Sequence, residues 1–307
     1  MFWSEKEKGT IEMIVAMVLS GTIGYFVVSS GQSFWNVVFF RCVIGAICLL
    51  AYVAYTKQFS RQLLTPQAFA VVLLGGMTLV ANWLLLFASF DYIAFSIAII
   101  AYHMQPIMLV LLSAIIYKQL PSVAVMFWLS TAVVGLWLVV DVDYQNLVAV
   151  LISNSEDTAV YGLLLALGAA FFYTLTTLLT KKVSHLPSAV VAVIQILFGG
   201  LFLLPWVDFS ALPESTIQWG HIFMLGVVNT GFMYVIMYDA FARLHTTVIA
   251  ILSFIYPIVA LLVDFAAFDH TISLLQGIGI VLILTAVAAV KLDWRLGRLF
   301  RPRRQSL

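Results

Sequence analysis

Long apolar stretches separated by short polar joints follow one another along the whole chain. Each stretch is long enough to cross about 30 Å of hydrocarbon as an α-helix that rises about 1.5 Å per residue. The pattern therefore predicts an all-α membrane protein with ten transmembrane helices. The expected spans are Ile11–Ser29, Phe34–Tyr55, Gln67–Phe90, Ala94–Tyr117, Ser122–Val140, Thr158–Thr180, Pro187–Trp206, Trp219–Ala242, Thr246–Phe265 and Leu274–Val290.

The charges of the joints alternate along the chain. One set of joints carries 14 of the 15 basic residues: Lys6, Lys8, Lys57, Arg61, Lys118, Lys181, Lys182, Arg243, Lys291, Arg295, Arg298, Arg301, Arg303 and Arg304. The other set has neither Lys nor Arg and carries acidic residues: Asp91, Asp141, Asp143, Glu156, Asp157, Asp208, Glu214, Asp264 and Asp269. Because basic joints stay on the cytoplasmic side of a membrane, both termini are expected in the cytoplasm.

The composition excludes a soluble protein. Hydrophobic residues make up 63% of the chain, charged residues make up 9%, and the mean hydropathy is +1.08. No soluble domain of 307 residues could hide that much apolar surface in its own core. The two cysteines, Cys42 and Cys48, are about 9 Å apart on one expected helix, too far for a disulfide. No metal or cofactor spacing is present, so neither is expected.

Two of the expected helices carry a proline near their middle. Pro106 lies in the stretch SIAIIAYHMQPIMLVLLSAIIYKQ, and Pro257 follows it by 151 residues in a similar stretch. A proline inside a helix removes one backbone hydrogen bond and clashes with the preceding turn. At membrane depth such a break is tolerated where the freed carbonyls meet protein or a water-filled cavity. Matching breaks in two halves indicate a binding site, with Pro106 and Pro257 at the breaks.

The two halves of the chain resemble each other at a nearly constant offset of 148 to 154 residues. The matched pairs are Tyr25 with Tyr173, Gly45 with Gly199, Gly75 with Gly226, Phe90 with Phe241, and Pro106 with Pro257. Each half holds five spans, an odd number, so the second half must be inverted relative to the first. Inverted repeats place a shared cavity at the midplane and provide two states, one open to each side.

This repeat defines the expected domain organisation. The first repeat covers residues 1–145 and the second covers 158–292. Residues 146–157 form a linker on the outer side, whose apolar centre, Leu147–Ile152, is compatible with a short interfacial helix. Residues 293–307 form a basic tail that is expected to bind the anionic cytoplasmic leaflet.

The chain resembles the EamA-type transporters of the drug/metabolite transporter superfamily. The resemblance is carried by YDAFARLHTTVIAILSFIYPIVALLVD from Tyr238 to Asp264, by a looser copy ending at Gln119, and by FFRCVIG around Arg41. It implies ten helices in two inverted five-helix repeats with both termini inside. It also implies transport of amino acids or other small metabolites, without naming the cargo.

Arg41 and His103 are the two ionisable side chains expected deep inside the spans. Arg41 could extend its long stem outward to lipid phosphates or to Asp264. Alternatively, it could face the cavity and hold a carboxylate or phosphate with its planar guanidinium. His103 could donate to a carbonyl freed by Pro106, or it could contact substrate or carry a proton. The repeat equivalents are Gln195 for Arg41 and Phe254 for His103.

Other polar and aromatic residues near the breaks are candidates for the cavity wall. The complete candidate set for substrate binding is Tyr25, Arg41, Asn82, Trp83, Tyr102, His103, Gln105, Tyr173, Gln195, Asn229, Tyr234, Ser253 and Tyr256. Each of the uncharged members could instead contribute interhelical hydrogen bonds. Aromatic walls with amide groups suit amino acids, aromatic compounds or organic cations.

The sequence predicts a secondary transporter of the bacterial inner membrane that exports a small metabolite such as an amino acid. Uptake of a nucleotide-like metabolite or a quaternary amine is the alternative. An intramembrane enzyme is not expected, because the chain lacks HExxH, GxSxG and paired intramembrane aspartates. The expected partners are a small-molecule substrate and membrane lipid but no nucleic acid, and we expect a monomer or a weak dimer.

Overall fold

The computed structural model describes residues 3–59, 65–93, 95–140, 156–268 and 271–294, and these ranges hold helices and no strand. Ten of the described segments are long and apolar enough to span a membrane, one for each expected span. The expected interfacial helix at Leu147–Ile152 lies outside the described residues. So does the basic tail beyond residue 294.

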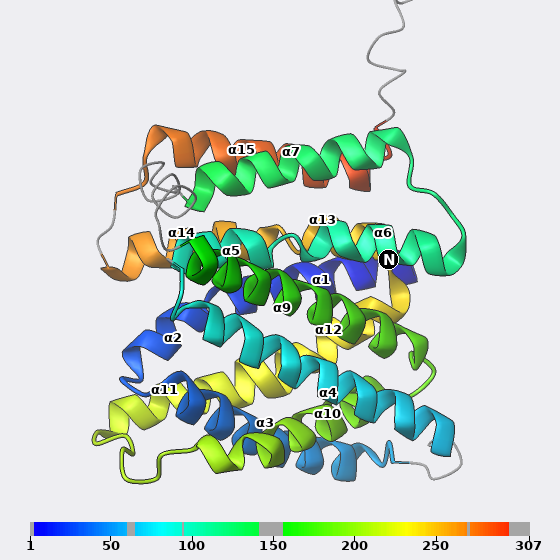
Figure 1. The fold of residues 1–307 in the computed structure, drawn as a ribbon. Helices are drawn as coiled ribbons and strands as arrows, with labels where there is room; N and C mark the ends of the chain where they lie inside the picture. The colour runs from blue at the N-terminus through cyan, green and yellow to red at the C-terminus, as the bar shows by residue number, and fades with distance from the viewer. Residues whose placement is uncertain (1–2, 60–64, 94, 141–155, 269–270, 295–307) are drawn as a thin grey trace, which may run out of the picture.

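Several of the spans are divided into two or more helical segments (Figure 1). The helices are α1 Glu5–Gly21, α2 Ile23–Ser29, α3 Phe34–Thr56, α4 Pro66–Ser89, α5 Phe95–Tyr102, α6 Gln105–Tyr117, α7 Val123–Val140, α9 Glu156–Lys182, α10 Ser188–Leu203, α11 Thr216–Gly226, α12 Met233–Arg243, α13 Thr246–Leu252, α14 Ile255–Phe268 and α15 Leu274–Lys291. A 3₁₀ turn, Leu204–Trp206, follows α10, and a π-helical segment, Val227–Phe232, joins α11 to α12.

The first span begins earlier than its hydrophobic pattern predicts. The expected start was Ile11, whereas α1 begins at Glu5. The reason is a capping box, in which the Ser4 hydroxyl accepts from the backbone N–H of Glu7 while the Glu7 carboxylate accepts from the N–H of Ser4. A polar first turn is therefore helical although it is not apolar.

The packing of the helices follows the repeat. Spans 2 and 7 (α3 and α10) pack on each other, as do spans 5 and 10 (α7 and α15), at opposite edges of the bundle (Figure 1). The proline-bearing spans 4 and 9 meet through α6 and α13, while α1 packs on α12 and its counterpart α9 packs on α4. Each of these contacts therefore either joins two equivalent helices or has an equivalent in the other half.

Both proline-bearing spans are broken one turn before the proline. The fourth span is interrupted between Tyr102 and Gln105, and the ninth is interrupted between Leu252 and Ile255. Across each break the backbone tightens, because Met104 N–H donates to Ala101 O and Phe254 N–H donates to Ile251 O, three residues back. The two breaks lie 150 residues apart, within one residue of the 151 that separate the two prolines.

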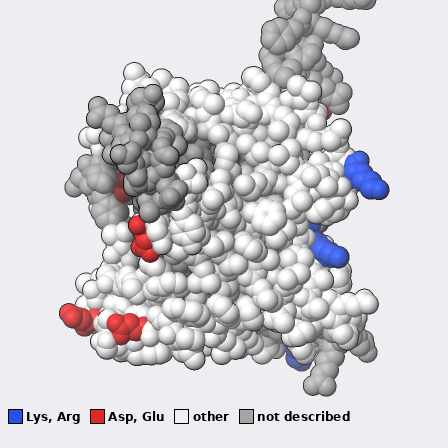
Figure 2. Space-filling view, viewed as in Figure 1, with Lys and Arg blue, Asp and Glu red and all other residues white. Residues whose placement is uncertain are grey.

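Charged side chains separate to the two ends of the helix bundle (Figure 2). Lys57, Lys118 and Lys291 follow or end helices at one end, which we call the basic end. Asp91, Asp208 and Glu214 lie in joints at the other end, which we call the acidic end. At the acidic end, hydrogen bonds from the Ser210 hydroxyl and backbone N–H lower the pKa of Asp208 below its usual value.

Helices α7 and α15 touch at a pair of glycines. A Cβ added to Gly279 would lie 2.9 Å from Val139 N and closer still to Gly135 O, whereas a Cβ added to Gly277 would meet nothing within 4 Å. Small residues at such crossings let membrane helices approach closely. The crossing therefore has no room for a side chain at position 279.

The substitution Gly279→Val is expected to lower the melting temperature of purified protein by several degrees, because overpacking costs about 1–3 kcal/mol. Gly277→Val adds the same side chain one half-turn away in open space and is the matched control. Thermal unfolding in detergent compares the two. Equal melting temperatures for both variants would contradict the close approach.

Candidate functional site

A cavity of about 620 Å³ lies between the two halves, within the size range of small-molecule sites. Its wall is built from the first four spans and from the sixth, eighth and ninth spans. The candidates from the sequence that line it are Arg41, Asn82, Trp83, Tyr102, His103, Gln105, Tyr173, Tyr234, Ser253 and Tyr256, together with Pro106. The structure thus brings residues from both repeats to one site.

Three other candidates and Pro257 lie outside the cavity lining. Tyr25 packs its ring edge-on against Phe26 and His221. Gln195 accepts a hydrogen bond from the Tyr238 hydroxyl and donates to Thr180 Oγ1 at 3.3 Å. Asn229 ties the eighth span to the break between α1 and α2, because its Nδ2 donates to Leu19 O and Thr22 Oγ1 at 2.6 and 3.0 Å. Gln195 and Asn229 thus form interhelical hydrogen bonds.

Arg41 lies on the cavity wall and is 8% exposed. Its Nε donates to Thr230 Oγ1 at 2.9 Å, and its Cζ lies 5.9 Å from the ring centre of Trp83, a cation–π distance. Among the described residues, its terminal guanidinium nitrogens have no hydrogen-bond partner and no acidic side chain lies within 4 Å. A charge inside a membrane protein costs about 2.5–3.5 kcal/mol on insertion scales. Arg41 bears this cost without a counter-ion in the described part of the chain.

His103 is held by the carbonyl one turn before it. Its Nδ1 lies 2.8 Å from Ile99 O, and because a carbonyl can only accept, Nδ1 must carry the proton. This is not the Tyr102 carbonyl that Pro106 leaves without its usual helical donor. Nε2 of the neutral ring is then an acceptor, and no described residue donates to it. The histidine thus offers an acceptor to the cavity.

Four rings form a continuous surface along one side of the cavity, which we call the aromatic wall: Tyr173, Tyr102, His103 and Tyr256. Tyr102 stacks on Tyr173 with ring centres 6.0 Å apart, and His103 stacks on Tyr256 at 5.3 Å. Tyr102 and His103 meet edge-on at 5.8 Å. The two stacked pairs join residues of the first repeat to residues of the second.

Asn82 places a buried acceptor without a described partner beside the cavity. The residue is 1% exposed, and its Oδ1 has no hydrogen-bond partner among the described residues. A buried carbonyl without a donor costs about 1–3 kcal/mol.

The cavity reaches the acidic end of the bundle. Its lining includes Val28, which ends the first span and is 66% exposed, and Phe34, which begins the second. Phe34 and Phe87 meet across this region with ring centres 4.7 Å apart. Here α4 lies apart from α2 and α3 along most of its length. The hydrophobic pattern of the spans gives no sign of this separation.

At the basic end the corresponding helices are closed together. Lys181 Nζ, on α9, donates to Phe241 O and Leu244 O at 2.7 and 2.5 Å. The Ser188 hydroxyl, on α10, donates to Asp239 Oδ1 of α12 at 2.6 Å. We call these contacts the basic-end closure. Sequence reasoning missed it, because Lys181 and Asp239 belong to charged helix ends whose partners only the fold determines.

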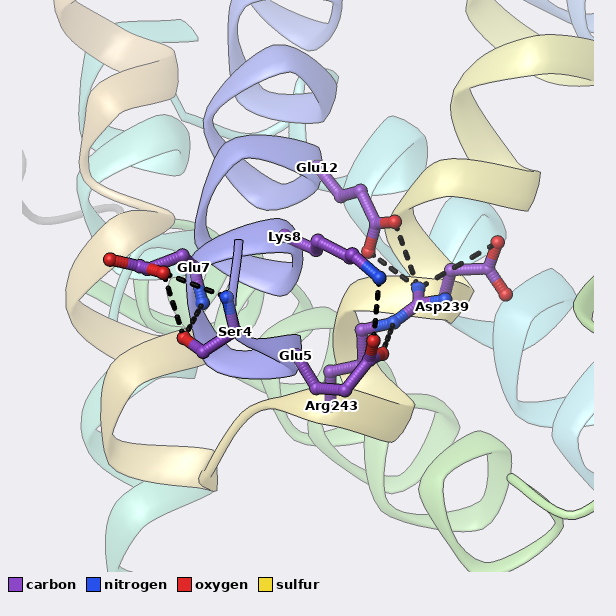
Figure 3. A network of polar contacts seen from close by, with 7 residues as sticks. All are labelled: Ser4, Glu5, Glu7, Lys8, Glu12, Asp239 and Arg243. Carbon is purple, nitrogen blue, oxygen red and sulfur yellow. Dashed lines mark hydrogen bonds and ion pairs between the residues drawn. The ribbon is translucent and has the colours of Figure 1, made fainter. Parts of the chain in front are cut away.

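A second polar network joins α1 to the end of α12 (Figure 3). Arg243 forms ion pairs with Glu5 at 2.9 Å and Glu12 at 2.7 Å, and Asp239 lies 3.9 Å away. At the other end of the bundle, the equivalent of Arg243 is Tyr92, which packs edge-on against Tyr161 of α9. The same helix pair is therefore held by ion pairs in one half and by an aromatic contact in the other.

Ten membrane-length helices in two equivalent halves around a polar, ligand-sized cavity are the features of a membrane transporter. The chain belongs to the EamA-like transporter family, whose model matches residues 7–141 and again residues 160–292. The expected resemblance is thereby confirmed.

Two relatives are similar to this chain in sequence, and one solved structure is similar to it in fold. An uncharacterized transporter of Bacillus subtilis (strain 168), YxxF, is 28% identical over 288 residues, which cover 93% of this chain and 90% of the relative. An uncharacterized transporter of Haemophilus influenzae is 25% identical over 182 residues, covering 59% of this chain and 58% of the relative. A crystal structure with a TM-score of 0.80 and 18% identity, covering 93% of this chain and 98% of its own, shares the fold.

Proposed function

We propose that this protein is a secondary transporter that carries a small metabolite across the membrane by alternating access around the central cavity. The observation that supports the proposal most directly is that the helices pack differently at the acidic and basic ends of the bundle. The cavity separates the backbone of α4 from α2 and α3, which meet α4 at the acidic end through side chains such as Phe34 and Phe87, whereas its counterpart α12 packs directly on α9 and α10 and is tied to them at the basic end. In inverted repeats, exchanging these two arrangements opens the cavity to the opposite side.

The contacts of the basic-end closure are those that this exchange has to break. They join α12 to α9 and α10 through Lys181, Ser188 and Asp239. The two proline breaks lie beside the cavity, where irregular backbone can move without a long helix being bent as a whole. Pro106 and Pro257 are therefore proposed as the points at which the fourth and ninth spans adjust.

The proposed direction is export, and the proposed cargo is an amino acid or a related compound. The cavity size, its aromatic wall and its amide and imidazole acceptors support a small polar or amphipathic cargo. Uptake of a nucleotide-like metabolite or a quaternary amine remains the second candidate. The proposed location is the bacterial inner membrane, with both termini cytoplasmic and the protein a monomer or weak dimer.

Flux measurements in liposomes test the proposal. Purified protein is reconstituted, loaded with a panel of labelled metabolites, and assayed in both directions with and without a pH gradient. We expect exchange of at least one compound, and we expect expression to raise the resistance of cells to a toxic analogue of that compound. Absence of flux for the whole panel in both directions would count against a transporter of small metabolites.

The variant His103→Phe is expected to fold and reach the membrane, because Phe254 occupies the equivalent position in the second repeat with 0% exposure. It removes the Nε2 acceptor from the cavity, so cargo affinity or the pH dependence of transport should be lost. Flux over a range of pH measures both. Flux and pH dependence identical to wild type would assign His103 a structural role.

A further inference from the structure

The charge distribution of the cavity limits what it can hold. Of the described residues that line it, only Arg41 carries a fixed charge, and none is Asp or Glu. A cation entering the cavity would meet Arg41 with no carboxylate to offset the repulsion. An anion would meet the terminal nitrogens of Arg41, for which no described residue supplies a partner.

The geometry of Arg41 favours a planar anion. Thr230 holds Nε, and Trp83 lies against the guanidinium, so the group is fixed while its two terminal nitrogens remain open. A guanidinium presents its donors in a fork that matches two oxygens of a carboxylate or of a phosphate, and the one fixed positive charge of the described lining balances the single negative charge of a carboxylate but not the two of a phosphate ester. The residue is 8% exposed and lines the cavity. The open nitrogens therefore form one half of a carboxylate-binding site.

The remaining surface of the cavity is suited to the rest of such a molecule. The aromatic wall offers ring faces for a planar or apolar body, through Tyr102 stacked on Tyr173 and His103 stacked on Tyr256. The imidazole acceptor, His103 Nε2, can receive an N–H or O–H group. Building on the proposed function, we infer that the cargo is a small carboxylate-bearing compound, with its carboxylate on Arg41 and its body against the aromatic wall.

Compounds that share one uncharged part, which we call the body, and differ in their charged groups test this inference. Phenylalanine, 3-phenylpropionate and 2-phenylethylamine have the same ring and nearly the same length, but they are a zwitterion, an anion and a cation. The same three charge types are prepared with indole and branched aliphatic bodies, and a phosphate ester of each body is added. Binding to purified wild-type protein is measured by calorimetry.

We expect carboxylate-bearing members to bind at least tenfold more tightly than the amine and the phosphate ester of the same body. Arg41→Gln, which copies the equivalent Gln195, should remove this preference, and Arg41→Lys should restore part of it. Lys57→Gln removes one positive charge from the exposed end of the same helix and should change nothing.

Three results would overturn the inference: amines binding as tightly as carboxylates, phosphate esters binding more tightly, or no carboxylate binding for any body. Carboxylate affinity that is unchanged in a folded Arg41→Gln protein would also overturn it. The binding measurement is independent of transport. Tight Arg41-dependent binding without flux would support the carboxylate site and contradict the proposed transport function. Flux of amines alone would support the transport function and contradict the carboxylate site.

Discussion

A disulfide between positions 188 and 239 is expected to stop transport almost completely, and reduction is expected to restore it. The Ser188 hydroxyl lies 2.6 Å from Asp239 Oδ1, so the two side chains face each other across the basic-end closure, and cysteines at these positions need only a small approach of the helices to be joined. The experiment uses Ser188→Cys with Asp239→Cys in a background without Cys42 and Cys48, which are both free thiols. Flux is measured after oxidation and again after reduction.

The two single-cysteine variants are the controls, because they share the loss of the hydrogen bond but cannot be joined. Each should transport equally before and after oxidation. If the fully oxidised double variant carried its cargo at the rate of the reduced protein, α10 and α12 would not separate during transport. Alternating access by opening of the basic end would then be wrong.

Lys181→Met is expected to shift the resting protein toward the state that is open at the basic end. The lysine donates two hydrogen bonds to backbone carbonyls of the eighth span, and bonds involving a charged group contribute about 1.5–3 kcal/mol each. Since about 1.4 kcal/mol is a factor of ten, loss of both bonds should raise the population of the other state at least about 100-fold. Ser253→Cys, in the cavity wall, serves as the reporter.

The reporter is labelled with a membrane-impermeant thiol reagent applied from one membrane face or the other. In Lys181→Met, labelling from the face of the acidic end should slow, and labelling from the face of the basic end should speed up. Lys182→Met removes the same charge from the next, exposed residue and should leave both rates unchanged. Equal rates in all three proteins would show that Lys181 does not hold the basic end closed.

Much of the fold can be predicted from the sequence because the membrane imposes a strong length and polarity requirement on each span. The ten spans, the all-helical class and the family follow from the apolar stretches, the constant repeat offset and the motifs around Pro257. The early start of α1 is a local exception. The apolar pattern begins at Ile11, but Ser4 and Glu7 form a capping box that extends the helix into polar residues.

The site was less predictable. A polar residue in a span can face a cavity or a neighbouring helix, and the local sequence does not distinguish the two. Arg41 and Asn82 face the cavity, whereas the equally polar Gln195 and Asn229 bond to other helices. The partner of Arg41, Thr230, is 189 residues away and belongs to the other repeat. Such pairings depend on how the two repeats dock, which local patterns do not describe.

The single fixed charge of the cavity also makes the carrier sensitive to the transmembrane voltage. When Arg41 is empty, a change of access moves an uncompensated positive charge relative to the membrane field, and one charge crossing a full 100 mV corresponds to about 2.3 kcal/mol. When a cargo with a net charge of −1 is docked through its carboxylate, the pair is neutral and the same movement carries no net charge. The membrane potential therefore acts on the return of the empty carrier and leaves the loaded step nearly unaffected.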